Sequence, residues 1–294
     1  MEINRHYKGL FAVDLDGTLL TDEKRFNPRD LTALQKLRDH GYAVAIATGR
    51  SDYSFNSLME KLQIRGSNNS LAVDYVCFST GAGLMEYPAE ILMNSISLPE
   101  GDVCTIVNHL ESTQLDYMIH RPVPETHYFK YRMHGGANPD FLRRLDIYSE
   151  YGSPLTQEGM SQPGEATEVL CIVPGDRGKN VAMSLQATFP QFSVIRATSP
   201  LDGESSWIEI FAPTVSKSSS MAWLAKRLGI SRQNTCAVGN DYNDEDLLSW
   251  AGKSYLVDNG PASLKKMFSV VASNNGAGTC EAISLWLGET SDRQ

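Results

Sequence analysis

The sequence predicts an α/β fold in which a Rossmann-like core with a parallel sheet is interrupted by an inserted α+β domain. Short apolar runs bounded by glycine alternate with amphipathic helical segments over residues 1–84 and again over residues 198–294. Such alternation is typical of a parallel sheet with crossover helices. It is less regular over residues 85–197, where mixed strands and helices favour a separate α+β domain. We therefore expect a core domain of residues 1–84 and 198–294, and an inserted domain of residues 85–197.

The first five elements are predicted in the order strand, helix, strand, helix, strand. They cover residues 9–15, 27–41, 42–48, 51–64 and 74–80. The first helix has clear ends, because Asn27 suits the N-cap, Pro28 suits the first helical position and Gly41 suits the stop. The strands are short apolar runs such as "YAVAIAT", which indicates that they are buried.

The inserted domain and the returning core follow in order. In the inserted domain, the patterns predict helices over 101–112, 138–152 and 178–191, and strands over 114–121, 168–175 and 192–199. In the returning core, they predict strands over 205–213, 234–240, 253–259 and 269–274, and helices over 216–229, 244–252 and 261–268.

The charge balance excludes some classes of partner. The chain carries 26 Lys and Arg against 35 Asp and Glu, a net charge of −9. A surface of this sign repels nucleic acid and anionic lipid, and no stretch approaches the roughly 20 apolar residues of a membrane helix. The five cysteines form no CxxC pair, which favours reduced thiols. We expect a soluble cytoplasmic protein, a monomer or weak homodimer, that binds neither nucleic acid nor membrane.

Two acids, Asp14 and Asp16, follow the first apolar strand in the stretch "FAVDLDGTLL". Residues two apart in extended backbone point the same way, so both carboxylates would face one small volume. A divalent cation that takes oxygen ligands, such as Mg²⁺, is the natural compensation for their repulsion. The alternative is that one acid caps the following helix and the other is solvated.

Thr48 and Gly49 follow the second strand, and Lys217 begins a later helix. A hydroxyl and free N–H groups at a helix start suit a phosphate, although threonine also caps helices in general. A lysine in the first turn opposes the helix dipole. Lys217 is therefore either a solvated side chain that tolerates this cost or a charge held over a bound anion.

The segment "VGNDYNDEDLL" places oxygen-bearing side chains directly after another predicted strand. They belong to Asn240, Asp241, Asn243, Asp244, Glu245 and Asp246. Some acids of this kind favour a helix N-terminus, but six such side chains exceed what capping requires. A second set of metal ligands is the better account. The carboxyl ends of parallel strands meet at one edge of the sheet, where ligands bind in open α/β folds.

The order DxDGT, TGR, an isolated lysine and GxxxND resembles the haloacid dehalogenase (HAD) superfamily of phosphohydrolases. The mixed insertion between TGR and the lysine is similar to the large α+β cap (C2B type) of its Cof-type branch, subclass IIB. The resemblance covers essentially the whole chain. It implies an Mg²⁺-dependent phosphatase that hydrolyses small phosphorylated metabolites, with sugar phosphates expected, through an aspartyl-phosphate intermediate.

The resemblance also implies roles for individual residues. Asp14 would be the nucleophile, and Asp16 would act first as acid and then as base, which needs a raised pKa. Thr48 and nearby backbone N–H groups would hold the phosphoryl group, and Lys217 would neutralise its charge. The expected catalytic set is Asp14, Asp16, Thr48, Gly49, Lys217 and Asn243.

The resemblance further implies that Mg²⁺ bridges Asp14, the backbone carbonyl of Asp16 and a ligand from the loop after Gly239. The expected metal set is Asp14, Asp16, Asn240, Asp241 and Asp244. The family pattern is GDxxND, but here Asn240 replaces the first acid and Asp241 follows it. Either Asn240 ligates and the site is one charge poorer, or the loop shifts and Asp241 serves. We expect Asn240, with Asp244 supporting it indirectly.

Other readings of the same chain stay open. The basic and aromatic segment His120–Gly136 is either a lid that contacts a phosphorylated sugar or an ordinary solvated surface. The protein could instead be a phosphotransferase or phosphomutase, since phosphomannomutases resemble this type of core and cap. It could also be a non-catalytic phospholigand-binding protein. Retention of Asp14, Asp16, Thr48 and Lys217 together argues against the last, because a dead site has no physical reason to keep like charges crowded.

Overall fold

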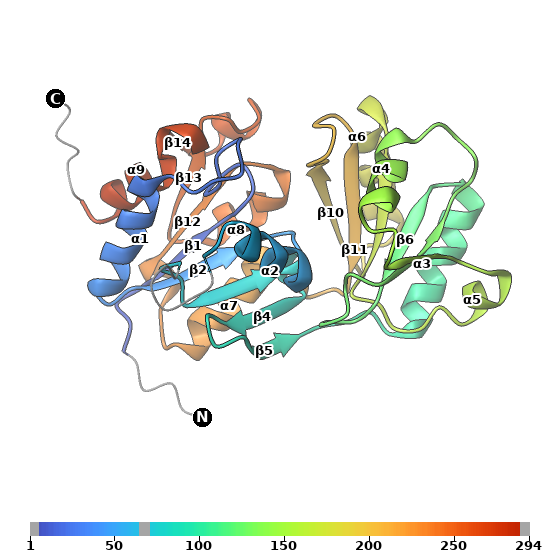
Figure 1. Cartoon of the computed structure of the whole chain (residues 1–294), viewed down its shortest axis with the longest axis horizontal. Helices are drawn as coiled ribbons and strands as arrows, with labels where there is room; N and C mark the ends of the chain where they lie inside the picture. Colours follow the sequence, from blue (N-terminus) through green and yellow to red (C-terminus); the bar gives the residue numbers. More distant parts are fainter. Residues whose placement is uncertain (1–5, 65–70, 289–294) are drawn as a thin grey trace. The chain divides into compact units, whose positions relative to one another are not determined.

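The computed structural model describes residues 6–64 and 71–288, and the chain divides into two compact units. The first, here called the core unit, consists of residues 1–50, 55–94 and 216–294. The second, here called the cap unit, consists of residues 51–54 and 95–215. The core unit therefore combines the N-terminal and C-terminal segments of the described chain, which are blue and red in Figure 1.

The core unit is built on one sheet with the strand order β14-β13-β12-β1-β2-β3-β4-β5. The strands are β1 (Leu10–Val13), β2 (Ala43–Ala47), β3 (Tyr75–Phe78), β4 (Gly83–Glu86), β5 (Ile91–Ser95), β12 (Thr235–Gly239), β13 (Lys253–Val257) and β14 (Ser269–Val271). Every pair from β14 to β3 is parallel, whereas β4 runs antiparallel to β3. The central strands are buried on both faces, which explains their continuous apolar sequences.

Helices cover both faces of this sheet. They are α1 (Pro28–Asp39), α2 (Asp52–Lys61), α7 (Lys217–Arg227), α8 (Glu245–Trp250) and α9 (Gly278–Trp286). Leu224 of α7 and Leu247 of α8 share one apolar cluster with Ala12 of β1. Phe11 points to the opposite face, where its ring centroid lies 6.0 Å from that of Trp286 in α9. Helix α1 packs beside α9 (Figure 1).

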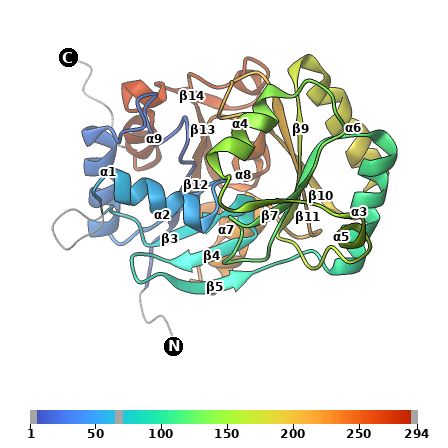
Figure 2. The same ribbon diagram turned by 45° about the vertical axis from the view of Figure 1, so that its right-hand side comes forward.

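The cap unit has its own sheet, with the strand order β10-β11-β9-β6-β7-β8. The strands are β6 (Tyr117–His120), β7 (Phe129–Arg132), β8 (Gly152–Pro154), β9 (Glu168–Val173), β10 (Ser193–Thr198) and β11 (Ser206–Phe211). The helices are α3 (Glu100–Thr113), α4 (Pro139–Ile147), α5 (Gln157–Ser161) and α6 (Gly178–Thr188). Figure 2 shows α6 beside β10 and β11, on which it packs. All strand pairs are antiparallel except β7 with β8, as expected for an α+β domain.

The predicted fold class, a parallel core with an inserted α+β domain, is confirmed, but the elements at the expected boundaries differ. Strand β11 was expected to return to the core, yet it pairs with β9 and β10 in the cap sheet. Residues 91–95 were expected in the insertion with no strand assigned to them, but they form β5, which extends the core sheet beyond β4. An apolar strand satisfies its pattern in either sheet, so the sequence does not distinguish them. The helix expected over 261–268 is only the 3-10 turn η5 (Leu264–Lys266).

A buried polar cluster lies within the cap unit. It contains His120, Glu168 and Glu209, which are 3%, 9% and 6% exposed, and the half-buried Arg144. His120 Nδ1 lies 2.7 Å from the Thr126 carbonyl and donates to it, so Nε2 accepts from Arg144 Nη2 at 3.5 Å. Burial, together with the Arg144 charge, lowers the pKa of His120 to about 3. The expectation that this region is an ordinary solvated surface therefore fails at His120.

Candidate active site

Three loops of the core unit meet at the carboxyl edge of its sheet. Val13 of β1 pairs with Val238 of β12 and with Ile46 of β2, so the residues that follow these strands lie at one level. Asp14 continues this alignment, since its N–H donates to the Val238 carbonyl at 2.9 Å. The DxDGT, TGR and GxxxND motifs thus converge although they are distant in sequence.

Lys217 joins two of these loops through its ammonium group. Its side chain is 0% exposed, and Nζ donates to Asp14 Oδ1 at 2.8 Å and to Asp244 Oδ1 at 2.6 Å. Ser216 caps α7 by accepting the N–H of Ser219, which fixes the first turn from which Lys217 projects. The lysine is therefore not a solvated side chain at a helix start but the cation of a buried triad.

Burial and charge act in opposite directions within this triad. Burial and the Asp244 carboxylate raise the pKa of Asp14 to about 7, and Lys217 limits the rise. Burial alone lowers the pKa of Lys217, but the two carboxylates outweigh it and raise that pKa well above its ordinary value. Lys217 is therefore a permanent cation at neutral pH, and Asp14 is the group whose charge responds to its surroundings.

Asp241 and Asp244 form a capping box around the 3-10 helix η4 (Tyr242–Asp244). Asp244 is fully buried, and its Oδ2 accepts the N–H groups of Asn240 at 2.8 Å and Asp241 at 3.1 Å. The Asp241 side chain accepts the N–H of Asp244 in return. Asp241 was the alternative metal ligand and Asp244 was expected to support the metal site indirectly, and in the structure both side chains hold the loop. Asn243 lies half-buried in the same turn.

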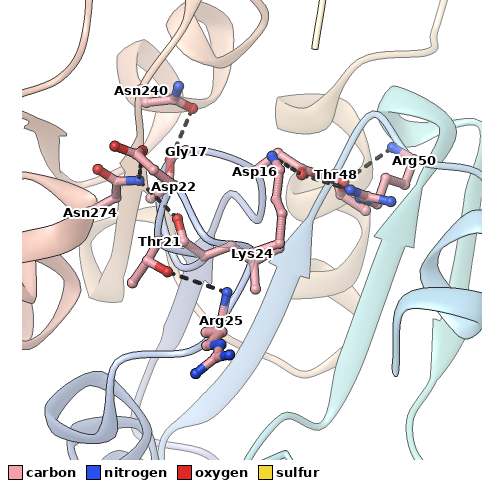
Figure 3. A network of polar contacts seen from close by, with 12 residues as sticks. Asp16, Gly17, Thr21, Asp22, Lys24, Arg25, Thr48, Arg50, Asn240 and Asn274 are labelled. Atoms are coloured by element: carbon pink, nitrogen blue, oxygen red, sulfur yellow. Dashed lines mark hydrogen bonds and ion pairs between the residues drawn. The ribbon is translucent and has the colours of Figure 1, made fainter. Parts of the chain in front are cut away.

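The Asp16 carboxylate is held by Arg50 and Lys24 (Figure 3). Arg50 donates from Nε to Oδ2 at 2.5 Å and from Nη2 to Oδ1 at 2.8 Å, and Lys24 Nζ lies 3.2 Å from Oδ1. Burial raises the pKa of Asp16, but the hydrogen bonds and charges of Arg50 and Lys24 outweigh it and lower that pKa. The raised pKa expected for a general acid is therefore not found in this arrangement.

Thr48 is placed by the backbone on both sides. It is 1% exposed, its N–H donates to the Cys77 carbonyl at 2.8 Å, and its own carbonyl accepts the N–H of Thr80 at 3.0 Å. Thr48 Oγ1 accepts the N–H of Arg50 at 3.1 Å, which closes the turn around the half-buried Gly49. This turn positions the Arg50 guanidinium for its contact with Asp16.

Asn240 faces Asp14 across a small group of oxygens. The inward terminal atom of its amide lies 3.1 Å from Asp14 Oδ2, 3.0 Å from the Asp16 carbonyl oxygen and 3.0 Å from Thr18 Oγ1. Ligands at 2.0–2.1 Å in an octahedron stand about 3 Å apart along each edge. One carboxylate, one carbonyl and one amide oxygen thus fit Mg²⁺. Within the described ranges no cluster of three His, Cys, Asp or Glu side chains suits a metal.

Two residues of the site had no assigned role in the sequence analysis. Arg50 stands in the TGR motif, but its partner Asp16 lies 34 residues away, and only the fold brings them together. Lys24 stands in no motif, and it reaches Asp16 from a backbone with φ of 56°. In the sequence, the one indication that Lys24 lies near Asp16 is its position in the short segment between the two acids and the first helix.

Comparison with known proteins identifies the family of the chain. The family model described as haloacid dehalogenase-like hydrolase matches residues 11–283. A protein of Streptococcus pyogenes serotype M6 with a provisional phosphatase name is 27% identical over 283 residues, covering 95% of this chain and 98% of that protein. Pyridoxal phosphate phosphatase YbhA of Escherichia coli is 24% identical over 280 residues, covering 90% of this chain and 93% of YbhA.

A solved structure shows the same fold. A haloacid dehalogenase-like hydrolase from Bacillus subtilis is similar with a TM-score of 0.73 at 20% identity, covering 94% of this chain and 99% of that chain. At this identity the likeness concerns the fold alone. Over residues 6–64 and 71–288, no helix combines the length and the apolar character needed to cross a membrane.

Proposed function

The chain belongs to the haloacid dehalogenase-like hydrolases, and on that premise we propose that it is an Mg²⁺-dependent phosphatase of small phosphorylated metabolites, with sugar phosphates as the favoured class. The observation that carries the proposal is the placement of Asp14. One carboxylate oxygen contacts Lys217, and the other faces Asn240 and the Asp16 carbonyl. A relative such as YbhA, named for pyridoxal phosphate, is also a phosphatase of a small phosphorylated metabolite.

In the first step, Asp14 attacks the phosphorus atom, and the bond from phosphorus to the leaving oxygen breaks. The leaving oxygen takes a proton from Asp16, and an aspartyl-phosphate forms on Asp14. The ion pairs of Asp16 with Arg50 and Lys24 favour its carboxylate form. Proton uptake by Asp16 before this step therefore requires that these contacts loosen.

In the second step, Asp16 takes a proton from a water molecule, which attacks the phosphorus atom of the aspartyl-phosphate. The bond to Asp14 breaks, and inorganic phosphate leaves. Lys217 remains charged throughout and holds Asp14 in one orientation while negative charge develops. Thr48, with the backbone at Gly49 and the side chain of Asn243, would bind the phosphoryl oxygens.

Asp14, the Asp16 carbonyl and Asn240 would hold the Mg²⁺. The cation, when bound, would supply positive charge beside the phosphoryl oxygens and favour the ionised form of Asp14. Asp241 and Asp244 would contribute only by holding the loop that carries Asn240. The capping contacts of Asp241 support Asn240 as the loop ligand in preference to Asp241.

The test is hydrolysis of p-nitrophenyl phosphate with Mg²⁺, with EDTA, and by the Asp14→Asn variant. We expect turnover that requires Mg²⁺ and falls at least about a thousandfold in Asp14→Asn, because the nucleophile is lost. Asp39→Asn, the same change at an exposed position on α1, should keep full activity.

The opposite outcome would identify one of the other functions. No turnover by the folded wild-type protein, combined with phosphoryl transfer between the positions of a sugar phosphate, would establish a mutase. No turnover and no transfer, with phosphate-ester binding retained, would establish a non-catalytic binding protein. If the wild-type protein is active, hydrolysis rates for a panel of sugar phosphates would decide the substrate class.

A further inference from the structure

The Asn240 amide can occupy its position in two orientations that differ by a half-turn about the bond between Cβ and Cγ. With Oδ1 inward, it accepts the Thr18 hydroxyl at 3.0 Å but also faces Asp14 Oδ2 and the Asp16 carbonyl, which are both acceptors. With the amide nitrogen inward, the same position donates to Asp14 Oδ2 at 3.1 Å and to the Asp16 carbonyl at 3.0 Å. With the nitrogen inward, both N–H groups are taken by Asp14 and Asp16, so the Thr18 hydroxyl, 3.0 Å away, receives no hydrogen of its own from the amide.

Each orientation is stable under a different condition. Three facing oxygens without a donor or cation among them repel one another, so the oxygen-inward form requires a positive charge. The nitrogen-inward form needs no ion, because its N–H groups satisfy the same two oxygens that would bind Mg²⁺. An aspartate at position 240 has no nitrogen-inward form and would leave three oxygens opposed when no metal is bound.

The neighbouring residues fix the position of the Asn240 amide, so rotation about the bond between Cβ and Cγ is the main motion left to it. The Asn240 backbone is fixed by the bond from its N–H to Asp244 Oδ2 at 2.8 Å. Gly17, with φ of 77°, lies so close to the outward Nδ2 that a Cβ atom there would come within 2.6 Å of it. The inward atom therefore keeps the same distances to its neighbours whichever element it is.

We propose that Asn240 is a two-position switch that closes the metal site with hydrogen bonds when no cation is bound and opens it by turning its carbonyl inward. The inference rests on the proposed metal site. It assigns Asn240 a second function beyond ligation, namely to stabilise the metal-free protein and to compete with Mg²⁺. The hydrogen bonds that stabilise the metal-free site therefore lower its affinity for Mg²⁺.

The experiment compares Asn240→Asp with the wild-type protein by calorimetric Mg²⁺ titration and by thermal unfolding in EDTA. The variant should bind Mg²⁺ roughly 10- to 100-fold more tightly, because it adds a charge and has no amide hydrogen bonds to break. It should also unfold at a lower temperature than wild type in EDTA, and Mg²⁺ should restore or exceed the wild-type midpoint. Asn243→Asp adds the same charge on the same loop and should change the Mg²⁺ affinity far less.

A spectroscopic measurement on the wild-type protein does not depend on any variant folding. The side-chain NH₂ signals of Asn240, assigned by their loss in Asn240→Ser, should be protected from hydrogen exchange in EDTA and lose that protection with Mg²⁺. Unchanged protection, or equal Mg²⁺ affinity and EDTA midpoint for Asn240→Asp and wild type, overturns the switch. If wild type binds no Mg²⁺ at all, the proposed metal site fails and the switch with it. If Asp14→Asn abolishes binding but Asn240→Asp changes nothing, the switch alone fails.

Discussion

The core and cap units both bury carboxylates, but they compensate them differently. In the core unit, Asp14 and Asp244 share the fully buried Lys217, which contacts both at 2.8 Å or less. In the cap unit, Glu168 Oε2 and Arg144 Nε are buried without a hydrogen-bond partner among the described residues. The core cluster is closed by its own cation, whereas the cap cluster keeps unused hydrogen-bonding capacity.

The difference extends to protonation. Burial and Glu209 raise the pKa of Glu168 well above its ordinary value, and only the Arg144 charge opposes them. For Asp14, a directly bonded ammonium opposes the rise, and its pKa reaches about 7. A contacting cation thus opposes the rise in the pKa of Asp14, whereas Glu168 Oε2 has no hydrogen-bond partner among the described residues and the pKa of Glu168 rises well above its ordinary value.

Removal of the core cation should have the largest effect on stability. Lys217→Met would leave Asp14 and Asp244 buried without their partner, and we expect a loss of about 3–5 kcal/mol in the free energy of unfolding. Urea denaturation in EDTA measures it. Lys226→Met, at an exposed position in the last turn of the same helix, should stay within about 0.5 kcal/mol of wild type. A loss for Lys217→Met no larger than for this control would contradict the pairing.

Neutralising the cap carboxyl should have a smaller effect that depends on pH. A carboxyl with a raised folded-state pKa stabilises the protein below its unfolded-state pKa, and this contribution is lost as pH rises toward the folded-state pKa. Glu168→Gln removes the loss, so its stability relative to wild type should increase between pH 5 and pH 8 by about 1 kcal/mol or more. Urea midpoints at both pH values measure this. Glu165→Gln, an exposed neighbour, should show no such trend.

The exposed ion pair at the active site should have the smallest effect on stability. Lys24 is 49% exposed in its side chain where it meets Asp16, so water screens the pair. Lys24→Ala should change the free energy of unfolding by less than about 0.5 kcal/mol. A loss comparable with that of Lys217→Met would mean that proximity to an acid, and not burial, decides the energy of these contacts.

The contrast between the two clusters also explains what the sequence could predict. Asp14, Thr48 and Asn240 each follow an apolar strand in a short local motif, so the carboxyl edge of a parallel sheet could be anticipated from their order. The cap cluster joins residues of β6, α4, β9 and β11, and no local pattern links them. Taken one at a time, the charged residues of this cluster are typical of a protein surface. For the same reason His120 was assigned to a solvated or lid-like segment.

Within the active site, the sequence could not predict which partner each side chain contacts. The backbone carbonyl of Asp16 faces Asn240 as expected, but its carboxylate, expected to have the raised pKa of a general acid, is paired with Arg50. Asp244 was expected near the metal, and its oxygens are taken by Lys217 and two backbone N–H groups. These contacts depend on side-chain rotamers and on partners distant in sequence, and the spacing of residues within a motif indicates neither.

The division of the chain has a consequence for how the protein can change over evolutionary time. Each contact that orients Asp14, from Lys217, Asn240 and the Val238 backbone, comes from the core unit. Residues 95–215 form a separate sheet with its own apolar cluster and its own polar network. None of these three contacts uses a residue of the cap unit, so selection can keep them while the residues of the cap unit diversify.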